Sequence, residues 1–185
     1  MENPSTVYHE RQRKQLCALH VLNNLFQKKD TFTQTELDDI CTSLTPSRFM
    51  NPHRSVLGLG NYDVNVITAA LQTRDLCLVW FDRRKNVEKI DFSKVKGVIL
   101  NVPSDYKIGF IKIPFDFKHW YVIRELEGSF YNLDSKLDKP ERLGDRQTVV
   151  DFLKQRLTLD KTQLLLVVEP AVENMGSWYM GDTEQ

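Results

Sequence analysis

The chain has 185 residues, of which 41% are hydrophobic, and this suits a single domain with a core of its own. Its 25 basic residues balance its 25 acidic ones, and a net charge of zero argues against binding nucleic acid or anionic lipid through bulk charge. We see no secretory signal and no apolar run long enough to span a membrane. Three cysteines imply no disulfide framework and favour a reducing compartment. We therefore expect a cytoplasmic monomer, with the nucleus also open.

The first half of the chain predicts three helices, at residues 16–26, 33–44 and 63–73. The first has apolar residues on more than one face, so we expect it to be buried on several sides. The second opens with the capping-box pattern of Thr33 and Glu36. Asp63 has the side chain of an N-cap for the third. Prolines and glycines predict a connecting segment over residues 46–62.

The composition then changes and predicts strands. Short runs rich in valine, isoleucine and aromatic residues lie at 76–81, 98–102, 120–126, 130–133 and 164–169. Gly128 falls between two of these runs and predicts a hairpin turn. Helices that precede an antiparallel-looking sheet are typical of an α+β fold.

A late helix is expected at about residues 145–157, before the last strand. Its inward face would consist of Val149, Phe152, Leu153 and Leu157. Pro170 ends the last strand, and residues 171–185 are predicted to form a short acidic tail.

Four polar residues stand in the order that a thiol hydrolase requires. Gln12 and Cys17 lie near the start of the chain, and His119 and Asp134 lie in the predicted sheet region. A thiol attacks a carbonyl as the thiolate, and a free cysteine has a pKa of about 8.5. We expect the start of the first helix and a neighbouring imidazole to lower that pKa.

Each residue has a role that its chemistry allows. His119, on a strand-like stretch, is the candidate base, and Asp134 at the end of the next strand could accept from its far nitrogen. The Gln12 amide could hold the oxyanion beside the backbone N–H of Cys17. A nucleophile on a buried helix and a histidine on a strand are typical of papain-like enzymes.

Structural interpretations of the single residues stay open beside the catalytic one. A cysteine near an apolar helix, such as Cys17, is usually a small core residue, and Asp134 suits an ordinary turn. His20 lies one helical turn after Cys17, but no second ligand pair follows, so we expect no metal and no cofactor. His9 and His53 lack any apolar or partnered context.

With these residues in place, the chain resembles the Josephin domain of ataxin-type proteins, and most of all the small stand-alone Josephin proteins. The matching stretches run through nearly the whole chain, at residues 8–12, 16–24, 60–67, 119–120, 131–135 and 164–168. The resemblance implies an α+β, papain-like cysteine protease fold with a catalytic helix packed on an antiparallel sheet. It implies a catalytic domain over residues 1–170.

The resemblance also implies a deubiquitinase that acts on ubiquitin and ubiquitinated proteins through an acyl-enzyme on Cys17. Gln12, Cys17 and His119 match the family's oxyanion, nucleophile and base positions. Asp134 stands where the ataxin branch has an asparagine, and a carboxylate there is chemically competent to orient the imidazole.

The family further implies a helical arm, residues 33–62, that frames the cleft. The ubiquitin tail ends in two glycines, so the groove must be narrow, and Trp120 and Tyr62 are predicted to line it. Val64 and Asn65 match a ubiquitin-contact segment, although Val64 as a plain core residue is an equal alternative.

Two rival functions remain open at this point. The chain could be a Josephin module that binds ubiquitin but turns over poorly until it is modified or joined by a partner. It could also be another thiol enzyme, such as a general peptidase or an acyltransferase, with the same catalytic residues.

Overall fold

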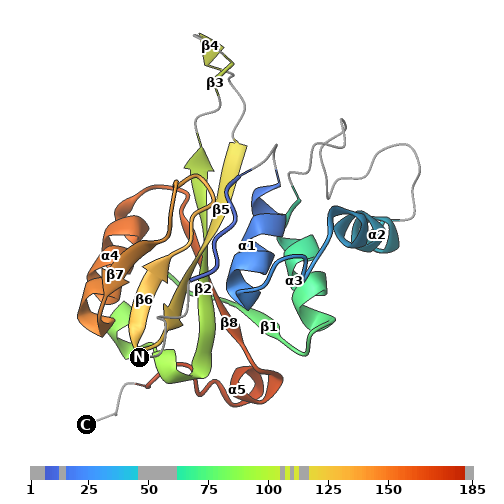
Figure 1. The fold of residues 1–185 in the computed structure, drawn as a ribbon. Helices are drawn as coiled ribbons and strands as arrows, with labels where there is room; N and C mark the ends of the chain where they lie inside the picture. Colours follow the sequence, from blue (N-terminus) through green and yellow to red (C-terminus); the bar gives the residue numbers. More distant parts are fainter. Residues whose placement is uncertain are drawn as a thin grey trace, which may run out of the picture.

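The computed structural model describes residues 7–12, 16–45, 62–104, 107–108, 111–112 and 117–181. A twisted antiparallel sheet runs through the middle, with helices on both faces (Figure 1). Two hydrophobic clusters occupy the two faces, one beneath the N-terminal helices and the other beneath the last long helix. Of the predicted connecting segment 46–62, residues 46–61 lie outside the described residues.

The sheet has six strands in the order β1-β8-β2-β5-β6-β7, and every neighbouring pair is antiparallel. Its strands are β1 (Cys77–Trp80), β2 (Val95–Ser104), β5 (Phe117–Leu126), β6 (Ser129–Asn132), β7 (Glu141–Gly144) and β8 (Gln163–Val168). A separate short pair consists of β3 (Lys107–Ile108) and β4 (Ile111–Lys112). The hairpin from β5 to β6 turns at Glu127 and Gly128, both with positive φ, as a two-residue type I′ turn requires.

Helices α1 (Cys17–Phe26), α2 (Gln34–Leu44) and α3 (Val64–Gln72) lie on one side of the sheet (Figure 1). The capping box of Thr33 and Glu36 begins α2, and the Asp63 carboxylate accepts from two backbone N–H groups at the start of α3, so both predicted caps are confirmed. Gly97 on β2 lets α1 pack closely, because a Cβ there would lie 2.5 Å from the Leu25 side chain.

On the opposite face lies α4 (Arg146–Thr158), with Val149, Leu153 and Leu157 buried as predicted. Phe152 is only half-buried, because it lies at the margin of the cluster with the Arg156 guanidinium over its ring. Two 3-10 turns, η1 (Val87–Lys89) and η2 (Phe92–Lys94), lead into β2.

The residues that follow β8 are structured, so the predicted tail is corrected for residues 171–181. They form helix α5 (Pro170–Met175) and then a β-bridge between Tyr179 and Ile90. Trp178 is buried in the second cluster, where its ring meets Phe81 edge-on. The acidic composition of this segment gave no sign of the packing, because the contacts come from two aromatic residues, Trp178 and Tyr179.

Candidate active site

Cys17 is the first residue of α1, the helix that packs across β5. Nine of the ten residues of α1 are buried, so the helix is held on several sides, as the sequence predicted. The Cys17 side chain lies against the backbone of Trp120, next to His119 in the chain. The fold therefore brings the thiol to the strand that carries the imidazole.

The pKa of Cys17 lies above its usual value because burial disfavours the charged thiolate. Backbone N–H groups of Trp120, Ala18 and Cys17 itself, together with the charge of Lys136, act in the opposite direction but do not outweigh burial. The expected lowering contributions from the helix start are thus present, but the net direction is opposite to the prediction. The resting thiol of the free protein is protonated at neutral pH.

His119 and Asp134 form a close pair. The hairpin of β5 and β6 returns the chain so that Asp134 follows β6 beside His119 on β5. The His119 Nε2 atom lies 2.6 Å from Asp134 Oδ1, and the two side chains are 4% and 19% exposed. Because a carboxylate only accepts, this bond places the proton on Nε2 and leaves Nδ1 as an acceptor.

Asp134 is ionised at neutral pH. Burial acts to raise its pKa, but the hydrogen bond and charge of His119, with the backbone N–H and charge of Lys136, hold the pKa below the usual value. The Lys136 N–H donates to the same Oδ1 atom over 2.8 Å. A fixed carboxylate of this kind sets the orientation of an imidazole and stabilises its protonated form.

Gln12 lies beside the loop that carries Asp134. Its backbone N–H donates to the carbonyl of Ser135 over 2.6 Å. The structure thus brings the segments of all four predicted residues together. The Cys17 thiol contacts the strand of His119, and His119 is hydrogen-bonded to Asp134. The Gln12 backbone is hydrogen-bonded to Ser135, the residue after Asp134. Their catalytic roles remain predictions.

The four predicted ubiquitin-contact residues divide into two kinds. Trp120 and Tyr62 are 4% and 1% exposed and belong to the core, where the Trp120 indole donates to the Tyr62 carbonyl over 3.1 Å. Val64 is half-buried against the same cluster, and Asn65 is exposed at the start of α3. Trp120 and Tyr62 therefore support from inside the surface at the start of α3, which we call the wall. Contact with ubiquitin stays a prediction for all four residues.

Sequence reasoning missed the partners of two histidines. His9 was predicted to lack a partner, but its Nε2 donates to the Asp134 carbonyl over 2.9 Å. His20 Nδ1 lies 2.7 Å from the Glu10 carboxylate, which accounts for its burial without a metal. Among the described residues, no three histidine, cysteine or acidic side chains group as metal ligands. His53 lies outside the described residues.

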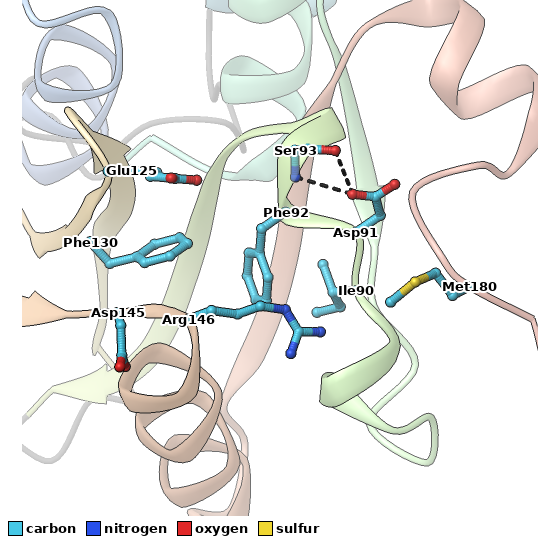
Figure 2. Close-up of a pocket in the computed structure, with 10 residues that line it drawn as sticks. Ile90, Asp91, Phe92, Ser93, Glu125, Phe130, Asp145, Arg146 and Met180 are labelled. Atoms are coloured by element: carbon cyan, nitrogen blue, oxygen red, sulfur yellow. Dashed lines mark hydrogen bonds between the residues drawn. The ribbon is translucent and has the colours of Figure 1, made fainter.

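A cavity of about 510 Å³ opens on the α4 side of the sheet (Figure 2). Its lining combines the rings of Phe92 and Phe130 with the Arg146 side chain, which lies over the Phe92 ring. Asp91 and Ser93 at its edge bond to each other. None of the four predicted catalytic residues lines this cavity, so it is separate from the candidate active site.

The sequence model of the Josephin family matches residues 12–168. The chain belongs to the Josephin family. Human Josephin-2 is 49% identical over 180 residues, which cover 97% of this chain and 95% of the relative. The Josephin-like protein of Drosophila melanogaster is 52% identical over 90% of this chain and 75% of its own length. Human ataxin-3 is 28% identical over 81% of this chain, and the match spans 42% of ataxin-3.

Membership of the Josephin family, together with helices packed on an antiparallel sheet, confirms the predicted α+β fold of the Josephin type. Among solved structures, the UCH37 catalytic domain of Trichinella spiralis bound to ubiquitin vinyl methyl ester covers 91% of this chain and 68% of its own. Its identity to this chain is 15%, and the TM-score is 0.39. Within the described ranges, no helix combines the length and apolarity needed to cross a bilayer.

Proposed function

We propose that this Josephin protein is a deubiquitinase, which hydrolyses isopeptide and peptide bonds at the C-terminal glycine of ubiquitin. The observation that carries the proposal is the 2.6 Å bond between His119 and Asp134, formed beside the strand position that the Cys17 thiol contacts. A nucleophile next to the strand that carries a base, and a carboxylate that orients this base, are the parts of a thiol hydrolase.

The proposed reaction begins with transfer of the Cys17 proton to Nδ1 of His119. The thiolate attacks the glycine carbonyl, and the Gln12 amide with the Cys17 N–H holds the oxyanion. The imidazolium then gives its proton to the leaving lysine amine, which yields an acyl-enzyme. Water, deprotonated by the same imidazole, releases ubiquitin. Asp134 stays ionised and keeps the ring oriented throughout.

Recognition of the ubiquitin tail is proposed at the wall formed by the start of α3. Asn65 is exposed there, and half-buried Val64 offers apolar surface. Tyr62 and Trp120 support this wall from within through their hydrogen bond. The arm predicted at residues 33–62 includes α2, which is tied to the wall by the 3.0 Å bond from the Tyr62 hydroxyl to Asp38.

A second candidate is favoured by the burial of the nucleophile. Cys17 is 4% exposed, and burial raises its pKa, so the free protein holds a protonated thiol that substrate reaches only after some opening. Such a protein would bind ubiquitin and turn over slowly until modification or a partner opened the site. None of the three cysteines, all of which lie in the described part of the chain, belongs to a disulfide, and this agrees with the cytoplasmic location that we propose.

The test is hydrolysis of ubiquitin with a fluorophore amide at its C-terminus, compared with an unrelated peptide amide. The proposal expects cleavage of the ubiquitin substrate only, and loss of that cleavage in Cys17→Ala. Cys77→Ala is the matched control, because Cys77 is a free thiol on β1 at the sheet edge. Cleavage that survives Cys17→Ala would contradict the mechanism. Ubiquitin binding without cleavage would favour the second candidate.

A further inference from the structure

The catalytic helix carries a stripe of polar side chains that the proposed reaction does not use. His20, Asn23 and Asn24 follow the spacing i, i+3 and i+4, which places them on one face of α1, and Gln27 is the C-cap residue that follows. The first three are buried, with exposures of 6%, 2% and 0%. Buried polar groups need partners, so this stripe must bind something specific.

Its partner is the N-terminal segment, residues 8–12, which leads to the predicted oxyanion residue. The Gln27 side chain accepts from Tyr8 N–H over 3.0 Å and donates to the Tyr8 carbonyl over 3.1 Å. The Glu10 carboxylate bonds to His20 and to Asn23, over 2.7 and 3.1 Å. Gln27 has a φ of 55°, where glycine is the usual residue, and its side-chain bonds to Tyr8 require the glutamine.

Asn24 differs from the rest of the stripe because it reaches two catalytic segments at once. Its Oδ1 accepts from Glu10 N–H over 2.7 Å, and its Nδ2 donates to the Leu133 carbonyl over 2.9 Å. Leu133 directly precedes Asp134. The amide orientation is fixed, because a backbone N–H only donates and a carbonyl only accepts.

The two segments joined by Asn24 also bind each other farther along. His9 donates to the Asp134 carbonyl, and Gln12 N–H donates to the Ser135 carbonyl. The N-terminal segment therefore lies between the catalytic helix and the loop of the orienting carboxylate. Asn24, which is fully buried on the helix of Cys17, sets the spacing of all three parts.

We propose that Asn24 is a positioning residue that holds the segment of Gln12 and the loop of Asp134 in register with Cys17. The proposal rests on the proposed function for its activity measurement, but its geometry concerns only this chain. The Asn24 amide touches none of the four predicted catalytic side chains through the hydrogen bonds described above, so it acts through the backbone of Glu10 and Leu133. Misplacement of reacting groups by about 1 Å can cost about a hundredfold in rate.

Asn23→Ala is the matched control for Asn24→Ala. Asn23 is a buried amide on the same helix, and it binds the Phe32 backbone over 2.9 and 3.2 Å and the Glu10 side chain. Both substitutions remove buried hydrogen bonds and should destabilise the fold. We expect only Asn24→Ala to lower kcat on a ubiquitin amide, by about a hundredfold with KM little changed. Equal losses of kcat in both variants at matched folded fraction would overturn the proposal.

A measurement without ubiquitin separates this proposal from the proposed function. Alkylation of Cys17 by a small reagent, followed against pH, reports how well His119 and Asp134 support the thiolate. Asn24→Ala and Asp134→Ala should both move the midpoint of this profile upward, whereas Asn23→Ala should leave it unchanged. If the native protein cleaves no ubiquitin, the proposed function fails while this profile still tests Asn24. An unmoved midpoint in Asn24→Ala would contradict the positioning role.

Asn24→Asp provides a variant of nearly the same shape in case Asn24→Ala does not fold. A neutral carboxyl group can accept from Glu10 N–H and donate to the Leu133 carbonyl, but an ionised one cannot donate. Burial and the charges of Glu10 and Asp134 would raise the pKa of this carboxyl. His20 and His9 also face the N-terminal segment, and a positive charge on either would act in the opposite direction. The kcat of Asn24→Asp relative to that of Asn24→Ala should fall as pH rises, because only the aspartate variant has a donor to lose. A flat ratio for Asn24→Asp would count against the proposal.

Discussion

Helices α1 and α4 cover opposite faces of one sheet, but they bury different kinds of side chain. The buried residues of α4 are all aliphatic: Val149, Val150, Leu153 and Leu157. α1 buries His20, Asn23 and Asn24 beside its apolar residues. Buried amides stabilise a fold less surely than apolar groups, because each must keep its partners. The difference indicates that α4 serves stability, whereas α1 gives up part of its apolar surface to hold the site together.

The largest expected effect lies at the start of α1. Cys17→Ala should reduce ubiquitin hydrolysis below detection, because the two other thiols, Cys41 and Cys77, lie on α2 and β1 rather than on α1. The free energy of unfolding should change little, since alanine fits the same buried space. Steady-state rates and a thermal melt check both statements. Residual hydrolysis in this variant would show that α1 does not carry the nucleophile.

Leu153→Ala on α4 should have the reverse outcome. Its side chain is fully buried, so truncation should lower the free energy of unfolding by about 2–5 kcal/mol. The kcat of the remaining folded protein should stay near the native value. Denaturant titration and kinetics at low temperature measure the two effects. A large loss of kcat at full folding would mean that the two faces are not separable.

Asp134→Asn should keep measurable activity, because an amide oxygen can still accept from His119. Activity should be lower, and the pH midpoint for Cys17 alkylation higher, since the charge that stabilises the imidazolium is gone. Complete loss of activity in a folded variant would show that the charge itself is required.

Acid unfolding offers a second measurement on Asp134→Asn. The pKa of Asp134 in the folded protein lies below the value of about 3.9 for an unfolded chain. Its contribution to stability is therefore full above that value and is lost as pH falls through the folded pKa. Stability of Asp134→Asn should thus fall less steeply below about pH 4 than that of the native protein. Parallel acid profiles would contradict the lowered pKa.

The smallest effect is expected on α2, which contributes a cap rather than a catalytic group. Thr33→Ala removes the hydroxyl that accepts from Glu36 N–H and should cost about 1 kcal/mol. Because Tyr62 links α2 to the wall at α3, any kinetic effect of this substitution should be on KM, and kcat should not change. A denaturant titration and a Michaelis curve are sufficient.

The sequence predicted the long elements well because their patterns are local. Periodicity and the side chains of Thr33 and Asp63 identified α2 and α3, and apolar runs identified most strands of the sheet. It missed β7 and the contacts of Trp178, since their pairing depends on distant partners. A short strand of charged residues at a sheet edge has no local pattern that distinguishes it from a loop.

For the candidate site, residue type and order sufficed to select Cys17, His119 and Asp134, and the structure brings their segments together. The direction of the Cys17 pKa could not be predicted, because it depends on how much solvent the fold removes. Asn24 was equally hidden. An asparagine on an apolar helix gains meaning only when its two backbone partners are known.

We propose that Cys17 is the nucleophile of a protein that acts on ubiquitin. The most direct test is incubation of the pure native chain with ubiquitin that carries a thiol-reactive group at its C-terminus, read by intact mass beside Cys17→Ala. We expect one covalently attached ubiquitin on the native chain and none on Cys17→Ala. A folded native chain that forms no adduct, or an adduct that persists in Cys17→Ala, would contradict it.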